Sequence, residues 1–110
     1  MIKSVPLWPG IITLSLVLGT LVIWLDTAHL GLCAAFLTTG SFALQVIHIV
    51  KTQETRAISI NMYLAFSCGV LLWLIYGLRT NDMPITIANS ITLALACAVL
   101  MLKLRNERNL

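Results

Sequence analysis

Long apolar stretches, separated by short polar connections, dominate the sequence. Four such stretches occur, each 19 to 21 residues long, at 7–25, 30–50, 58–78 and 85–104. Because an α-helix rises about 1.5 Å per residue, each stretch can cross a hydrocarbon core of roughly 30 Å as a helix. Backbone groups find no water in lipid, so open strands and loops are excluded there. The pattern therefore predicts an all-α protein with four membrane-spanning helices.

The connections between these stretches carry the turn and capping residues. They read "DTAH" at 26–29, "KTQETRA" at 51–57 and "RTNDMP" at 79–84. Asn81 and Asp82 are suited to cap the last helix, and Pro84 suits its first turn. Residues 105–110 are expected to form a tail outside the membrane.

Composition supports a membrane location. The chain is 59% hydrophobic and 10% charged, against roughly 45–50% and about 25% in soluble domains. Too few polar residues remain to coat a surface that faces water. No basic patch with interleaved aromatic residues is present, so we expect no nucleic-acid partner.

The seven Lys and Arg residues are distributed unevenly over the connections and ends. If all four stretches span, Arg79 lies on one side, and the other six lie opposite: Lys3, Lys51, Arg56, Lys103, Arg105 and Arg108. Positive residues favour the cytoplasmic side. We therefore expect both termini and the 51–57 connection in the cytoplasm.

The first stretch allows more than one interpretation. It follows Lys3 at the start of the chain, as the hydrophobic region of a signal peptide would. Its 19 apolar residues are long for that role, and no A-x-A cleavage site follows. We expect residues 1–28 to be a retained extra helix, with a cleaved signal or an upstream start codon as the alternatives.

Polar residues recur along one face of the second stretch. Thr38, Ser41, Gln45 and His48 are spaced by three, four and three residues, so on a helix they fall within an arc of roughly 80°. Two interpretations stay open. The stripe lines a path that water can reach, or it forms interhelical hydrogen bonds worth about 1 kcal/mol each. His48, near Lys51, is expected to be a membrane-edge residue rather than a proton carrier.

The third and fourth stretches each place one unusual polar or aromatic side chain in the membrane. Asn89 lies near mid-depth and shares a helix face with Thr86 and Thr92. Trp73 lies deeper than the usual interfacial belt. A deep indole facing an amide suits a sugar, because the ring stacks on C–H groups while the amide meets hydroxyls. Helix association through Asn89 is the alternative.

Residues for catalysis or metal binding are not apparent. No acidic residue falls inside a stretch, and no nucleophile–base pair or Gly-rich phosphate loop occurs. Cys33, Cys68 and Cys97 match no metal-binding spacing. We expect neither an enzyme nor a cofactor nor a bound metal.

From residue 31 to residue 104 the chain resembles the SemiSWEETs, bacterial half-size relatives of the SWEET sugar transporters (PQ-loop, MtN3/saliva-like). The matching segments are "AAFLTTGSF", "QVIHIVKTQETRAISINMYLAF", "GVLLWLIYGL" and "DMPITIANSITLALA". The resemblance implies a three-helix unit at 29–104, preceded here by the extra helix and followed by a cytoplasmic tail at 105–110. It also implies a homodimer in the bacterial inner membrane that passes a mono- or disaccharide by facilitated alternating access.

The resemblance also assigns candidate site residues. Trp73 and Asn89 would form the sugar pocket. The remaining assignments are a cytoplasmic gate of Phe42, Met62 and Phe66, and an extracellular gate of Tyr76, Arg79 and Asp82. Arg79 lies one residue earlier than the usual arginine, which puts its pairing with Asp82 in question.

Besides the extra N-terminal helix, one motif departs from the family pattern, and two other functions stay open. The family's Pro-Gln motif is Leu44-Gln45 here, and because proline bends a helix, a straighter helix is expected. A small multidrug exporter has a similar size, but it relies on a carboxylate in its first helix, which is missing here. A membrane scaffold that transports nothing is the third possibility.

Overall fold

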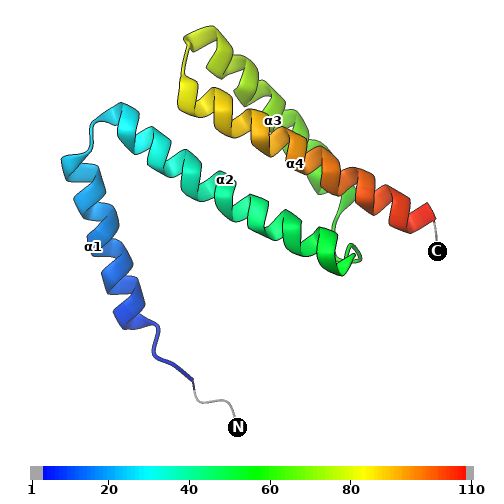
Figure 1. The fold of residues 1–110 in the computed structure, drawn as a ribbon, viewed down its shortest axis with the longest axis horizontal. Coiled ribbons are helices and arrows are strands. Elements are labelled where there is room, and N and C mark those ends of the chain that lie inside the picture. Colours follow the sequence, from blue (N-terminus) through cyan, green and yellow to red (C-terminus); the bar gives the residue numbers. More distant parts are fainter. Residues whose placement is uncertain (1–3, 109–110) are drawn as a thin grey trace. The chain divides into compact units, whose positions relative to one another are not determined.

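The computed structural model describes residues 4–108, which form four α-helices and no strand. They are α1 (Trp8–Trp24), α2 (Thr27–Thr52), α3 (Ile60–Thr80) and α4 (Met83–Arg108), as Figure 1 shows. By length and composition, α2, α3 and α4 can each cross a membrane. The predicted all-α architecture is confirmed, and the chain is a multi-pass membrane protein.

The chain divides into two compact units, Met1–Leu30 and Gly31–Leu110. The first contains α1, a 17-residue apolar helix without a buried side chain. Its Thr13 and Thr20 hydroxyls donate to backbone oxygens one turn earlier, at 2.9 and 2.8 Å, so they are satisfied within the helix. Trp8 and Trp24 stand exposed at its two ends, as interfacial aromatic residues do. At 17 residues, α1 is shorter than the three helices that are long enough to cross a membrane, and its crossing stays a prediction.

The connection before α2 is shorter than the sequence suggested. Asp26 accepts a hydrogen bond from the backbone N–H of His29 at 2.9 Å. It therefore occupies the position of an N-cap, and the turn that follows becomes helical. The predicted loop at 26–29 is wrong for this reason, since α2 already begins at Thr27.

The second unit is built on a hairpin of α3 and α4, which lie side by side (Figure 1). Asn81 ends α3 in the left-handed conformation, with φ of 55°, a conformation that asparagine tolerates better than most residues. Asp82 then caps α4 by accepting from the N–H of Ile85 at 3.1 Å. Asp82 is thus the cap that the sequence predicted, whereas Asn81 belongs to the end of α3.

The hairpin closes tightly because α3 presents a glycine to α4. A Cβ atom on Gly77 would lie 2.7 Å from the Thr86 Oγ1 atom and 2.9 Å from the Ile85 Cγ2 atom. Small residues permit such close approach between helices in a membrane. Gly77 therefore fixes the register of α3 against α4.

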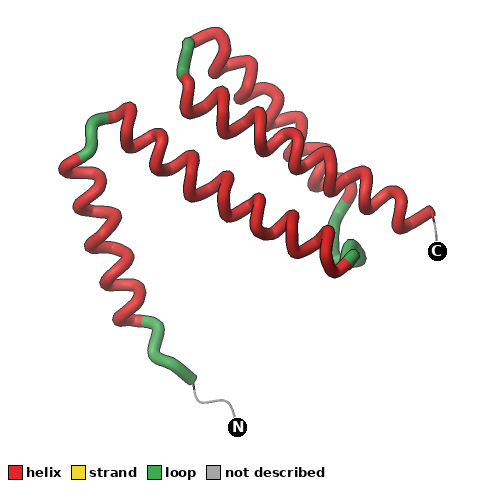
Figure 2. The backbone as a smooth tube through the Cα atoms, in the orientation of Figure 1, coloured by secondary structure: helices red, strands yellow, loops and turns green. Residues whose placement is uncertain are grey.

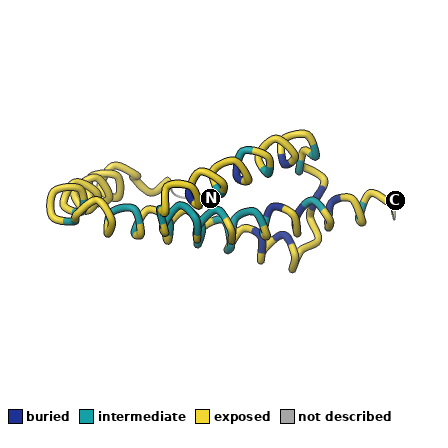
Figure 3. Tube along the Cα trace, turned by 90° about the horizontal axis from the view of Figure 1, so that it is seen from above, coloured by how far each residue is buried: buried dark blue, intermediate teal, exposed yellow. Residues whose placement is uncertain are grey.

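The buried side chains of the second unit gather toward the connection between α2 and α3. The core comprises Val46 and Ile49 of α2, Tyr63 of α3, and Ala96 and Val99 of α4. Figure 3 shows these buried positions along the tube of the second unit. All three helices thus contribute to one core.

The polar ends of the second unit also differ from the prediction. The α2–α3 connection occupies residues 53–59 rather than 51–57, as the green loop in Figure 2 shows. Gln53 ends α2 in the left-handed conformation, with φ of 58°. The predicted tail is helical as far as Arg108, because α4 continues beyond its apolar stretch. Residues 109 and 110 lie outside the described residues.

Candidate functional site

The polar stripe of α2 points away from the core of its own chain. Thr38, Ser41, Gln45 and His48 are all exposed. The Thr38 and Ser41 hydroxyls donate to carbonyls of α2 itself, at 2.9 and 2.6 Å. Within residues 4–108, neither Gln45 nor His48 has a side-chain partner. Among the described residues, the stripe therefore does not attach α2 to α3 or α4.

Trp73 and Asn89 lie at the same depth on the two helices of the hairpin. Gly77 packs against Ile85 and Thr86. Because the two helices are antiparallel, the residue one turn before Gly77 in α3 lies level with the residue one turn after Ile85 in α4. These two positions are Trp73 and Asn89. The two predicted pocket residues therefore flank the same level of the α3–α4 seam.

Both side chains keep binding capacity at this level. The Asn89 amide nitrogen donates to the Ile85 carbonyl at 2.8 Å. One N–H and the side-chain oxygen of Asn89 have no partner among the described residues. Trp73 is 55% exposed. Its ring and the ring of Tyr76 pack edge to face, with centres 5.4 Å apart. The arrangement offers one indole ring and one amide to a ligand.

The predicted cytoplasmic gate is partly assembled within one chain. The rings of Phe42 and Phe66 meet edge to face with centres 5.7 Å apart. Buried Tyr63 lies 6.2 Å from Phe66 and joins α2 and α3 in the core. Tyr63 is not among the gate residues predicted from the sequence, although its position three residues before Phe66 places it beside that ring on a helix. Met62 is 54% exposed and is not part of this aromatic cluster.

The predicted extracellular gate is not closed by an ion pair within the chain. Two contacts between a basic and an acidic side chain occur among residues 4–108, His29 with Asp26 and Lys103 with Glu107. Arg79 is exposed at the end of α3, and Asp82 is occupied as the cap of α4. Tyr76 lies against Trp73, so it joins the predicted gate to the predicted pocket.

The remnant of the Pro-Gln motif lies in an unbroken helix. Helix α2 runs without interruption from Thr27 to Thr52, through Leu44 and Gln45. Leu44 is 70% exposed and supplies the backbone N–H that proline would lack. A bend imposed by proline is therefore missing at this position.

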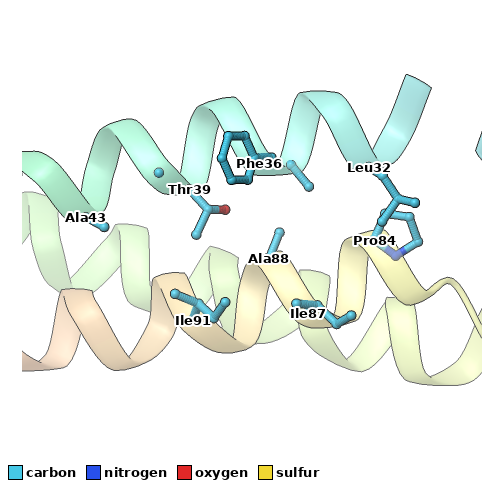
Figure 4. Close-up of a pocket in the computed structure, with 10 residues that line it drawn as sticks. Leu32, Phe36, Thr39, Ala43, Pro84, Ile87, Ala88 and Ile91 are labelled. Atoms are coloured by element: carbon cyan, nitrogen blue, oxygen red, sulfur yellow. The ribbon is translucent and has the colours of Figure 1, made fainter. Parts of the chain in front are cut away.

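An apolar groove of about 530 Å³ lies between α2 and α4. Figure 4 shows Phe36 and Thr39 of α2 facing Ile87, Ala88 and Ile91 of α4. None of the predicted pocket or gate residues lines it. Because sugar hydroxyls require polar partners, this groove is a poor sugar site.

Within residues 4–108, no three His, Cys, Asp or Glu side chains gather closely enough to hold an ion. The chemistry available at the candidate site is thus aromatic stacking and hydrogen bonding.

Comparison with known proteins identifies close relatives of the region 28–105. Those residues match the family model MtN3_slv, described as "Sugar efflux transporter for intercellular exchange". The sugar transporter SemiSWEET of Leptospira biflexa is 49% identical over 75 residues, which cover 68% of this chain and 88% of that protein. The SemiSWEET of Escherichia coli strain UMEA 3162-1 is 46% identical over 85 residues, covering 76% of this chain and 96% of the relative.

The fold matches a solved structure as well. A crystal structure of SemiSWEET in the inward-open conformation superposes with a TM-score of 0.70 at 44% identity. The match covers 74% of this chain and 88% of that one. The family-model match at 28–105 covers α3 and nearly all of α2 and α4, and leaves α1 aside.

Proposed function

The chain belongs to the MtN3_slv family of sugar efflux transporters, and on that basis we propose that it carries a small sugar across a membrane by alternating access. The observation that carries the proposal is the pair Trp73 and Asn89, level with each other on α3 and α4. The indole would stack on the C–H face of the sugar, and the free Asn89 groups would bond its hydroxyls. The SemiSWEET relatives are sugar transporters, which agrees with this chemistry.

The transport unit proposed here is a homodimer. Three helices are too few to enclose a passage as wide as a sugar. The stripe of Thr38, Ser41, Gln45 and His48 is exposed within one chain, and polar groups in a membrane face a partner or a cavity. Two copies would bring their stripes and pockets around one central path. Cross-linking of single cysteines introduced along α3 tests this arrangement, and exclusively monomeric protein in the bilayer would contradict it.

Two gates would close the path alternately in this scheme. The Phe42–Phe66 contact would contribute to the cytoplasmic gate, with Met62 completing it across the dimer. Tyr76, Arg79 and Asp82 would contribute to the extracellular gate, where Arg79 is free of an ion pair within residues 4–108. A sugar would shift the balance between the two states only as far as it binds one of them better.

The proposed orientation places the C-terminus and the 53–59 connection in the cytoplasm of a bacterial cell. The excess of Lys and Arg at that end favours it. Labelling of single cysteines with a membrane-impermeant reagent tests it. Cysteines placed near Arg79 should react with the reagent from outside the cell. Reaction of cysteines near Arg105 from outside would instead reverse the proposed orientation.

Uptake of labelled glucose and sucrose into proteoliposomes tests the transport function itself. Saturable uptake that does not require a proton or sodium gradient is expected, because no carboxylate lies within the apolar stretches. Matched empty liposomes provide the background. A proton-driven efflux of lipophilic cations, with no sugar flux, would instead support the multidrug exporter.

A further inference from the structure

A second groove of interest lies where α2 ends and α4 leaves its apolar stretch. It has a volume of about 610 Å³. Val50 of α2 and Ala98 and Met101 of α4 contribute to its apolar wall, and Arg105 and Arg108 stand at its edge. The groove is thus an apolar hollow flanked by two guanidinium groups.

The basic residues at the end of α4 point in two directions. Lys103 is buried, and its Nζ atom is engaged by the Thr55 carbonyl and the Glu107 carboxylate. Arg105 lies two residues later, roughly 200° around the helix. Arg105 and Arg108 share a face at a spacing of three and are exposed. Among the described residues, neither arginine lies within ion-pair distance of a carboxylate.

The depth of these groups matches the layout of a lipid molecule. The last apolar stretch ends at Leu104, so Arg105 is the first residue beyond it, and Arg108 lies about 5 Å farther out. Met101 and Ala98 lie one and two turns deeper. The charges therefore fall at headgroup level, and the apolar wall falls at the level of the acyl chains.

Two other grooves in the second unit lack this combination. The groove of Figure 4 is lined without a charged residue. The groove beside the 53–59 connection, of about 590 Å³, combines Arg56 and Lys103 with Glu54 and Glu107, so its charges balance. Excess positive charge beside an apolar wall distinguishes the groove at Arg105 and Arg108.

We propose that this groove binds one anionic phospholipid. Arg105 and Arg108 receive its phosphate, and an acyl chain lies against Val50, Ala98 and Met101. Guanidinium groups match phosphate oxygens through paired hydrogen bonds, and basic pockets between membrane helices are known to hold anionic headgroups. The assignment to the cytoplasmic leaflet rests on the proposed orientation, whereas the binding itself does not depend on transport.

Native mass spectrometry of the purified protein tests the site. The protein is titrated separately with dioleoyl phosphatidylglycerol, dioleoyl phosphatidylcholine and glycerol 3-phosphate. We expect the first to bind at least about fivefold more tightly than the second. We expect no binding of glycerol 3-phosphate, which lacks acyl chains.

Variants assign the binding to the groove. Arg105→Gln and Arg108→Gln should each weaken phosphatidylglycerol binding about fivefold. Ala98→Trp should weaken it by filling the apolar wall without altering charge. Arg56→Gln removes the same charge at the end of the second unit where α4 finishes, but it lies outside the groove, so it should leave binding unchanged.

Equal binding of the two phospholipids would overturn the proposal, as would unaltered phosphatidylglycerol binding to the double variant R105Q/R108Q. Lipid binding to monomers but not to dimers would also overturn it, because a second copy would then cover the groove. Sugar uptake in the same preparation separates the two claims. Uptake without lipid selectivity contradicts only the lipid site, and lipid selectivity without uptake contradicts only the transport function.

Discussion

Lys103 of α4 reaches the α2–α3 connection, where its Nζ atom donates to the backbone oxygen of Thr55 at 2.8 Å. Both residues are buried, at 7% and 5% exposure, and Glu107 balances the charge at 3.0 Å. Asn106 adds a bond of 3.1 Å to the Thr55 hydroxyl. This group of side chains holds the 53–59 connection against the end of α4.

Replacing Lys103 with methionine should release that connection. The buried Thr55 carbonyl would lose its charged donor and keep the backbone N–H of Ile58 at 3.1 Å, and hydrogen bonds to charged groups contribute about 1.5–3 kcal/mol. We expect the free energy of unfolding in detergent to fall by a similar amount, and amide exchange in residues 53–59 to accelerate. Lys51→Met removes an exposed lysine and should change the stability by less than about 0.5 kcal/mol. Equal stability of the two variants would contradict this role of Lys103.

A methyl group on Gly77 should disturb the hairpin of α3 and α4. The new Cβ would lie 3.0 Å from the Thr86 backbone nitrogen, besides its closer contacts with side chains. Such overpacking costs about 1–3 kcal/mol. Gly69 lies on the same helix with nothing within 4 Å, so Gly69→Ala should be neutral or stabilising by up to about 1 kcal/mol. Thermal unfolding of the two variants in detergent measures the difference, and equal melting temperatures would refute it.

Asp26 should respond to acid through its contacts with His29. The backbone N–H and then the ring of His29 hold the pKa of the Asp26 carboxyl below its ordinary value of 3.8. Since the folded pKa is the lower one, the carboxylate supports the start of α2 above pH 3.8 and loses this role as the pH falls through the folded pKa. NMR titration of the carboxyl carbon measures this midpoint.

Substitution of His29 separates its two contributions to that pKa. His29→Ala removes the ring contact of 2.6 Å and keeps the backbone N–H. The midpoint should therefore rise while staying below 3.8. A midpoint that His29→Ala leaves unchanged would show that the ring does not act on Asp26.

The sequence predicted the helices well because lipid imposes one simple requirement, a long apolar run. It also predicted that Trp73 and Asn89 lie within the third and fourth helices, and that the residues of the α2 stripe share one face. It could not predict which way that face points, since this depends on the packing of Val46 and Ile49 against Ala96 and Val99. That packing directs the stripe outward.

Polar residues at the helix ends were harder to assign. Asn81 and Asp82 both favour caps, and only the turn geometry decides that one ends α3 and the other begins α4. In the sequence, Lys103 is one of several positive charges near the end of the last apolar stretch. Its bond to Thr55 joins residues 48 positions apart, and no local pattern predicts such a contact.

Uptake of labelled sugar by pocket variants in proteoliposomes tests the central claim most directly. Trp73→Ala and Asn89→Ala should each lower uptake about tenfold, as expected for loss of one stacking or hydrogen-bonding contact of about 1.4 kcal/mol. Ser90→Ala and Leu72→Ala are matched controls on the same helices, both exposed and outside the predicted site, and should transport normally. Normal uptake by both pocket variants, with folding and insertion intact, would contradict a sugar site at Trp73 and Asn89.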